Sequence, residues 1–323
     1  MKVLVTGAGG FIGSHLTEYL AASGFEVRAF VRYNSNNRWG WLDTLPIKRD
    51  IEVITGDIRD YDSVYNAVKG CKVVFHLAAL IGIPYSYISP LAYIKTNVEG
   101  AYNILQSTKE SGVEQILMTS TSETYGTAQY IPIDEKHPLV GQSPYSATKI
   151  AADQLAISYY RSFGLPVKIV RPFNTYGPRQ SARAVIPTIV TQILSECQTL
   201  KLGNLSPTRD LTYVKDTVAG FIKIFESQEL FGEVTNIGMN QEISIGDLAK
   251  SIMEIMNLSK PINLEEQRIR PEDSEVEHLR CDNTKITTKT PWRPRYELIQ
   301  GLTETINWIK ENLSFYKAGI YNV

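Results

Sequence analysis

The chain has 323 residues, 43% of them hydrophobic, and its 33 Lys and Arg residues nearly balance 34 Asp and Glu residues. This composition excludes a disordered or collagen-like chain, and the formal net charge of −1 excludes bulk attraction to nucleic acid or to an anionic membrane. Three widely spaced cysteines and four isolated histidines predict no metal site, and no apolar run reaches the ~18 residues of a membrane span. A strand-like run begins directly after Met1 and leaves no room for a signal peptide, so we expect a cytoplasmic protein.

Short, apolar, β-branched runs alternate with amphipathic stretches through the first half of the chain. The predicted strands cover residues 2–6, 26–31, 51–55, 72–76, 115–119 and 167–171, and the predicted helices cover residues 11–23, 60–69, 98–111 and 144–163. Strands that alternate with helices at this spacing predict right-handed crossovers. The fold class is therefore α/β, with a parallel sheet that helices cover on both faces.

The pattern changes after Arg171. Prolines at positions 172, 178, 187 and 207 interrupt the chain, and longer helices are predicted at residues 214–226, 245–256 and 298–312. We interpret residues 1–171 as the first domain and residues 172–323 as mainly a smaller C-terminal α/β lobe, with some segments crossing between the two.

Three glycines, Gly7, Gly10 and Gly13, separate the first predicted strand from the first predicted helix. Glycine at this spacing permits a tight turn, close approach of the backbone to a pyrophosphate and close packing of the helix on the strand. The amides at the start of the helix, which include those of Phe11 and Ile12, then bind the anion. An ordinary glycine-rich turn is the alternative, but the flanking strand and helix favour a Rossmann-type domain that binds NAD or NADP.

The second predicted strand indicates which dinucleotide is bound. A carboxylate normally holds the adenosine ribose of NAD there, but this chain has Arg32 at that position. An arginine fork suits the 2′-phosphate of NADP, so NADP is the preferred cofactor and NAD the alternative, unless Arg32 is simply a solvated surface residue. Asp57, followed by Ile58, either contacts the adenine or caps the next helix. Small residues after the fourth strand let the cofactor approach, namely Leu77, Ala78 and Ala79.

Tyr145 and Lys149 lie four residues apart at the start of a predicted helix, so their side chains share one face. A cation close to a phenol favours the phenolate, which is a usable base near neutral pH. We therefore expect a lowered pKa at Tyr145. A shift of ~3 units requires about 4 kcal/mol, which Lys149 and a cationic nicotinamide are expected to supply together.

Thr121, Ser122 and Glu123 follow the fifth predicted strand, and an open parallel sheet forms its ligand crevice at the carboxyl ends of its strands. Thr121 is expected to hydrogen-bond a substrate hydroxyl beside Tyr145. Glu123 discriminates between reactions, because removing a proton next to a ketone and losing a neighbouring hydroxyl require a base and an acid. The alternative is that Glu123 is a solvated loop carboxylate.

Together these residues resemble the extended short-chain dehydrogenase/reductase family of NAD(P)-dependent nucleotide-sugar epimerases and dehydratases. The resemblance covers nearly the whole chain, and two further motifs carry it: Arg171-Pro-Phe-Asn174-x-Tyr-Gly-Pro178 and Arg209-Asp-Leu-x-Tyr-Val-x-Asp216. The run Thr121-Ser122-Glu123 matches dehydratases of the GDP-mannose type. Residues 119–187 look most like the N-acetylglucosamine 4,6-dehydratases of legionaminic-type sugar pathways. Other 4,6-dehydratases carry Asp where this chain has Ser122, which leaves Glu123 to serve as both base and acid.

The resemblance implies a nucleotide-sugar 4,6-dehydratase for a UDP- or GDP-GlcNAc type of substrate. In such an enzyme Tyr145 takes the proton of the 4-hydroxyl while hydride leaves carbon 4, Glu123 removes the proton of carbon 5, and the 6-hydroxyl leaves as water. The hydride then returns to carbon 6, so the cofactor stays bound. Two alternatives remain: a 4-epimerase, which has no use for Glu123, and a non-catalytic NADP-binding regulator.

A nucleotide diphosphate requires cations, which the second lobe contains. By resemblance, Arg209 and Arg270 bind the diphosphate, Asn174 contacts phosphate or sugar, and residues 200–203 lie against the base. An arginine taken alone is most often an ordinary surface charge, so this prediction depends on the clustering of the arginines in the second lobe. The full set of predicted substrate-binding residues is Asn174, Arg179, Arg183, Lys201, Arg209 and Arg270. The helices at 98–111 and 144–163 resemble the pair that forms a four-helix interface in this family, which implies a homodimer.

Overall fold

Seven strands form one parallel sheet in the computed structural model, which describes residues 1–317 apart from the side chain of Glu272. The order is β11-β6-β5-β4-β1-β2-β3. The bounds are β1 (Lys2–Thr6), β2 (Glu26–Arg32), β3 (Glu52–Gly56), β4 (Val73–His76), β5 (Gln115–Thr119), β6 (Val167–Pro172) and β11 (Val234–Ile237). All six predicted strands are present, with ends shifted by no more than one residue. The predicted α/β class is confirmed, and the strand order is that of a Rossmann-type sheet.

Helices cover both faces of this sheet. On one face α1 (Phe11–Ala22) and α8 (Val214–Glu226) pack on the strands, and on the other face lie α2 (Tyr61–Val68), α5 (Gly100–Glu110) and α6 (Pro144–Phe163). Val3 and Val5 belong to the core on the first face, whereas Leu4 belongs to the core on the second. Because both faces are buried, the three central residues of β1, Val3 to Val5, are all apolar, which is the pattern that predicted a parallel sheet.

The seventh strand, β11, comes from the second part of the chain and was not predicted. It pairs with β6 at the edge of the sheet, and α8 precedes it, so residues beyond 171 complete the first domain. Asn236 interrupts the apolar pattern of β11, which hides the strand in the sequence. In the fold this side chain is fully buried, and its Oδ1 accepts a hydrogen bond of 2.8 Å from the hydroxyl of Tyr125.

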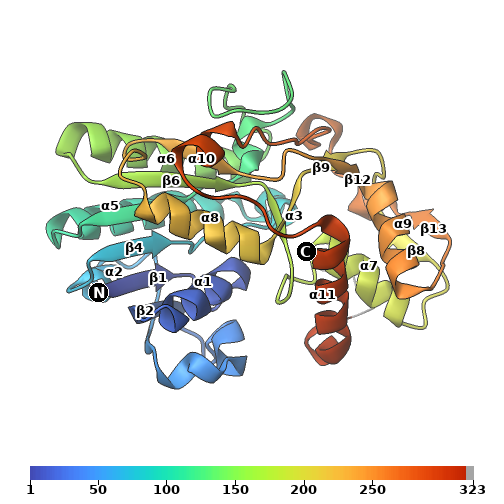
Figure 1. Ribbon diagram of the computed structural model, residues 1–323, viewed down its shortest axis with the longest axis horizontal. Coiled ribbons are helices and arrows are strands. Elements are labelled where there is room, and N and C mark those ends of the chain that lie inside the picture. Colours follow the sequence, from blue (N-terminus) through green and yellow to red (C-terminus); the bar gives the residue numbers. More distant parts are fainter. Residues whose placement is uncertain (318–323) are drawn as a thin grey trace.

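The smaller lobe lies to the right of the sheet in Figure 1, where α7 (Val185–Leu194), α9 (Ile245–Met256) and α11 (Leu298–Glu311) lie close together. Short strand pairs complete it: β8 (Leu200–Leu202) with β13 (Ile262–Leu264), β9 (Thr208–Arg209) with β12 (Ile243–Ser244), and β7 (Asn174–Tyr176) with β10 (Leu211–Tyr213). The remaining α-helices are α3 (Ile83–Ile88), α4 (Pro90–Tyr93) and α10 (Thr284–Lys289). Over residues 1–317, no helix is long and apolar enough to cross a membrane.

The helix predicted from residue 98 begins earlier, at Pro90. It passes from α4 through a π-helical turn, Ile94–Glu99, into α5. The π-helical turn carries Asn97, whose side chain accepts a hydrogen bond from the amide of Leu80 at 2.9 Å and donates one to the carbonyl of the same residue at 3.0 Å. Asn97 therefore fixes the chain that follows β4. Such π-helical turns are frequent at functional sites.

A buried ion pair connects the ends of β5 and β6 to the middle of α6. Arg171, at the end of β6, donates to Asp153 of α6 at 2.7 Å, and both side chains are 2% exposed. Ser120, just after β5, donates to the same carboxylate at 2.5 Å and accepts from Arg171 at 3.2 Å. The pair thus fixes the chain that leaves β5 against α6.

Replacing Asp153 with Asn should lower the free energy of unfolding by about 3–5 kcal/mol, because the substitution leaves the buried charge of Arg171 unpaired. Urea unfolding followed by circular dichroism measures the change. Glu226→Gln, which breaks an exposed pair with Lys223, is the control and should change stability by less than about 0.5 kcal/mol. A loss below about 1 kcal/mol for Asp153→Asn would contradict the assignment.

A second set of polar contacts joins α1 to the chain after β7. The Nε2 atom of His15 lies 3.0 Å from the carbonyl oxygen of Pro178, and Arg179 forms a 2.7 Å ion pair with Glu18. Burial lowers the pKa of His15 from 6.5 to about 4, and the charge of Arg179 acts in the same direction. The imidazole is therefore neutral in the folded protein at neutral pH.

His15 should make the protein less stable in mild acid. The unfolded chain takes up a proton on this residue with a pKa near 6.5 and the folded chain only near 4, so stability falls as pH decreases between these values. The loss amounts to about 3 kcal/mol for this residue. A His15→Gln variant should show a flatter decline of the urea midpoint from pH 7 to pH 4. The exposed His278→Gln is the control, and an identical decline in the wild type and His15→Gln would refute the assignment.

Candidate active site

A pocket of about 880 Å³ opens along the carboxyl ends of the sheet strands. Its wall is formed by the glycine turn after β1, the chain ends after β2 to β5, the start of α6 and residues of the 172–184 segment. The predicted site residues in the wall are Gly7, Gly10, Phe11, Ile12, Gly13, Arg32, Asp57, Ile58, Leu77, Ala78, Ala79, Thr121, Ser122, Glu123, Tyr145, Lys149, Asn174, Arg183 and Arg270. Arg179, Lys201 and Arg209 are not part of it.

The glycine turn has the close packing that the sequence predicts. Gly7 has a φ of +70°, and a Cβ there would lie 2.8 Å from the amide nitrogen of Ala78. A Cβ at Gly13 would lie 2.2 Å from the carbonyl oxygen of Gly7. Side chains are thus excluded at both positions, and the start of α1 is accessible from the pocket. The turn fits a pyrophosphate held by backbone amides.

Cationic residues dominate the part of the wall after β2 and β3. Arg32 and Arg38 are exposed there, and Asn34 lies between them in the sequence. Asp57 binds the side chain of Arg59, which lowers the pKa of the carboxyl group. The carboxylate is therefore paired with an arginine, while Asp60 takes the N-cap position of α2.

Residues that sequence reasoning missed shape the segment after β4. The Oγ1 atom of Thr6 accepts hydrogen bonds of 3.2 Å from the amides of Leu77 and Ala78 and lies 2.8 Å from Nδ1 of His76. Burial lowers the pKa of His76 to about 3, so this residue is a neutral packing partner. The wall also extends beyond Ala79 to Tyr85. Residues 80–85 follow the same strand end as residues 77–79, so their position after β4 was the signal in the sequence that could have identified them.

Tyr145 and Lys149 line the pocket from the first turns of α6, which Ser143 caps by accepting a hydrogen bond from the amide of Ser146 at 3.1 Å. Lys149 donates to the carbonyl oxygen of Thr119 at 2.5 Å, and burial lowers its pKa. The expectation of a lowered pKa at Tyr145 is wrong for the chain by itself. Burial raises this pKa well above 10, the hydrogen bond with Thr121 offsets part of the effect, and the charge of Glu123 raises it further.

Thr121 and Glu123 lie at one short turn after β5. Thr121 is the N-cap of a 3₁₀ turn, Ser122–Tyr125, and its hydroxyl accepts the amide of Glu123 at 3.3 Å. The same hydroxyl is hydrogen-bonded to Tyr145. Glu123 is partly exposed to the pocket, whereas Ser122 is 2% exposed. A phenol, a hydroxyl, a carboxylate and an ammonium thus share one wall, a set suited to proton transfer.

The predicted substrate-binding residues do not all reach the pocket. Arg183 and Arg270 line it, and so does Asn174, whose Oδ1 atom has no hydrogen-bond partner among the described residues. Arg209 is buried and pairs with Glu275 at 3.0 Å, and Lys201 pairs with Glu265 at 3.4 Å in the smaller lobe. Arg179 pairs with Glu18 of α1. Sequence spacing could not place these side chains, because their partners are distant in the chain.

Comparisons with known proteins agree with this geometry. The family model for GDP-mannose 4,6 dehydratase matches residues 4–305. UDP-N-acetyl-alpha-D-glucosaminuronate decarboxylase of Bacillus cytotoxicus is 32% identical, over 96% of this chain and 98% of that protein. The dTDP-glucose 4,6-dehydratase of Streptomyces venezuelae, solved with NAD bound, superposes with a TM-score of 0.90 at 28% identity, over 98% and 99% of the two chains.

A further solved structure with the same fold is that of an enzyme named for a different reaction. UDP-glucuronic acid 4-epimerase of Bacillus cereus, solved with NAD and its UDP-sugar, superposes with a TM-score of 0.88 at 29% identity, over 97% of this chain and all of that one. The glycine turn, the Tyr145–Lys149 pair and the match over residues 4–305 together show that this chain belongs to the GDP-mannose 4,6-dehydratase family, within the extended short-chain dehydrogenase/reductases.

Proposed function

We propose that the chain is a nucleotide-sugar 4,6-dehydratase for a UDP- or GDP-linked sugar of the N-acetylglucosamine type. The observation that carries this proposal is the position of Glu123 in the same wall as Tyr145, with its charge close enough to raise the pKa of that phenol. A 4-keto sugar requires a base to take the proton of carbon 5. An epimerase has no such step.

The remaining residues of the wall have roles in this reaction. Tyr145, whose phenol is hydrogen-bonded to the side chain of Thr121, receives the proton of the sugar 4-hydroxyl. Burial keeps this phenol protonated in the chain alone, so its use as a base requires positive charge nearby, from Lys149 and from a bound nicotinamide. Glu123 then takes the carbon 5 proton and protonates the leaving 6-hydroxyl. The Oδ1 atom of Asn174, which accepts no hydrogen bond from the residues that the structure describes, is available to a substrate hydroxyl or amide donor.

A bound NAD or NADP would supply the redox chemistry of this reaction, as a reversible acceptor of hydride. The turn at Gly7 and Gly13 fits a dinucleotide because a Cβ at either position would clash with backbone. We propose NADP as the cofactor. Its support is Arg32 and Arg38 in the wall after β2, with Asp57 already paired to Arg59. The two solved relatives were determined with NAD, which makes NAD the alternative.

A 4-epimerase is the second candidate, supported by the likeness to the Bacillus cereus enzyme. A non-catalytic NADP-binding regulator is less well supported, since it has no use for Tyr145, Lys149 and Glu123 in one wall. We also propose a homodimer formed by α5 and α6, whose exposed large side chains include Tyr102, Tyr160 and Phe163.

Incubation with UDP-GlcNAc and GDP-GlcNAc in deuterated water distinguishes these functions by product mass. A dehydratase should release one water and place deuterium at carbon 5. Glu123→Gln should slow dehydration roughly 10²–10⁴-fold, because the base is lost, while the transient absorbance of reduced nicotinamide persists. Glu135→Gln, whose carboxylate accepts the amide of Asn236, is the control. A 4-epimer formed without loss of water would refute the dehydratase, and full dehydration by Glu123→Gln would refute the role of Glu123.

Cofactor preference is tested separately by fluorescence titration of apoprotein with NADPH and NADH. Arg32→Ala should weaken NADPH binding roughly 10- to 100-fold and leave NADH binding nearly unchanged, because only NADPH has a 2′-phosphate. Arg161→Ala, at the far end of α6, is the control. Equal losses for the two nucleotides, or tighter NADH binding by the wild type, would exclude NADP preference.

A further inference from the structure

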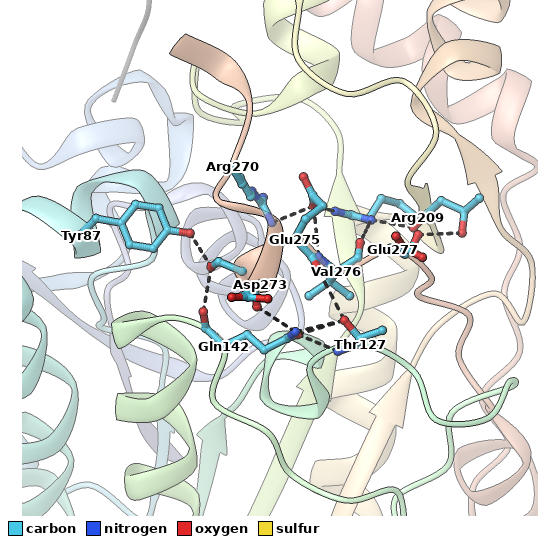
Figure 2. Close-up of polar contacts among 11 residues, drawn as sticks. Tyr87, Thr127, Gln142, Arg209, Arg270, Asp273, Glu275, Val276 and Glu277 are labelled. Atoms are coloured by element: carbon cyan, nitrogen blue, oxygen red, sulfur yellow. Dashed lines mark hydrogen bonds and ion pairs between the residues drawn. The ribbon is translucent and has the colours of Figure 1, made fainter. Parts of the chain in front are cut away.

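Residues 270–277, here called the strap, cross from the smaller lobe to the first domain beside the pocket. The hydroxyl of Ser274 lies 2.6 Å from that of Tyr87 in α3 and donates to the carbonyl of Gln142 at 2.7 Å. The side chain of Gln142 in turn donates to the carbonyl of Asp273 at 3.1 Å. Figure 2 shows these bonds joining the strap to α3 and to the loop before α6.

Glu275 of the strap lies between two arginines (Figure 2). Its Oε1 atom is 3.0 Å from Nη2 of Arg209 and 3.5 Å from Nη1 of Arg270, and it also accepts the amide of Val276 at 3.2 Å. Two cations therefore converge on a single carboxylate. The group carries a net charge of +1 at the edge of a pocket whose wall includes one of the two arginines, Arg270.

Arg209 is not part of the pocket wall, and the strap binds its side chain. Its side chain is 9% exposed, and its Nη1 atom donates to the carbonyls of Thr208 at 2.8 Å and Val276 at 2.7 Å. Burial lowers the pKa of Arg209, and the charge of Glu123 opposes this effect, so the guanidinium lies within electrostatic range of Glu123. Arg209 is thus close to the reacting groups but bound by the strap.

We infer that Glu275 is a specificity-determining residue that occupies the place of a substrate phosphate between Arg209 and Arg270 and is displaced by a diphosphate. This inference rests on the proposed function, which supplies a diphosphate to the site. A diphosphate carries more charge and more acceptor oxygens than one carboxylate, so it can bind both arginines together where Glu275 binds them by a single oxygen. A neutral sugar or a single carboxylate cannot compete in this way.

The displacement requires little rearrangement of the main chain. Val276 is 1% exposed and packs in a cluster with Tyr125, Ile133 and Phe173, which fixes the strap directly after Glu275. Rotation of the Glu275 side chain is therefore enough to free Nη2 of Arg209 and Nη1 of Arg270, while Nη1 of Arg209 keeps its bonds to the carbonyls of Thr208 and Val276. A nucleotide can bind both arginines only in molecules whose Glu275 carboxylate has left them. The apparent affinity for the nucleotide is therefore the intrinsic affinity multiplied by the fraction of molecules in which Glu275 is unpaired.

The test compares the binding of UDP, GDP and dTDP to the wild type and to Glu275→Gln by calorimetry. The amide keeps a hydrogen-bond acceptor for Arg209 but removes the competing charge. The nucleoside diphosphate that binds the wild type should therefore bind the variant roughly 3- to 10-fold more tightly. Glu275→Ala should also bind more tightly, and the melting temperature without nucleotide monitors folding. Glu233→Gln, which removes the same charge from an exposed pair with Lys285, should leave affinity unchanged.

A double variant separates displacement from a general change in charge. If Arg209 is the group that Glu275 releases, the gain should disappear when Glu275→Gln is combined with Arg209→Ala. Weaker or unchanged binding by both Glu275 variants would overturn the inference and leave the proposed function standing. Failure of all three nucleoside diphosphates to bind any variant or the wild type would overturn the proposed function together with the inference.

Discussion

Parallel pairing of β1 with β4 is the constraint on which the rest of the site depends. The register places Thr6 opposite His76, so both strands end at the same level and the chain leaves them in opposite directions across the sheet. A crevice opens where the strand order reverses in this way. The hydroxyl of Thr6 then binds the amide of Ala78. Gly7 lets the backbone at Ala78 approach so closely that a Cβ at position 7 would clash with it. The glycine turn and the 77–85 wall therefore form together.

Charge burial is the second feature of the site. Lys149 and Arg171 are both buried, and Asp153 is the carboxylate paired with Arg171. Lys149 relies on the carbonyl of Thr119 and on the charge of Asp153, which raises its pKa against burial. The charges of Lys149 and Arg171 are thus matched by those of Asp153 and Glu123, and the phenol of Tyr145 remains protonated in the chain alone. This arrangement suits a proton acceptor that becomes active only when a cationic cofactor and a substrate hydroxyl are added.

Much of the fold was predictable because parallel strands and amphipathic helices leave strong local patterns. The strands around Val3 and Val74 each contain an unbroken run of three apolar residues, and the helix that carries Tyr145 has a proline and a capping serine at its start. β11 was missed because Asn236 breaks its pattern, and its hydrogen bond with Tyr125 links residues far apart in the chain. The start of α4 was missed because Pro90 begins a helical run that continues through a π-helical turn.

The sequence by itself determined the residue types of the site, since a glycine triplet and a tyrosine four residues before a lysine are local patterns with a direct physical meaning. It also placed Thr121 and Glu123 at a strand end. Only the tertiary structure decided the pairing and protonation of the charged groups. Burial reversed the expected pKa shift of Tyr145, and Arg209 pairs with Glu275 outside the pocket wall. These outcomes depend on desolvation and on partners distant in the chain, which no local pattern encodes.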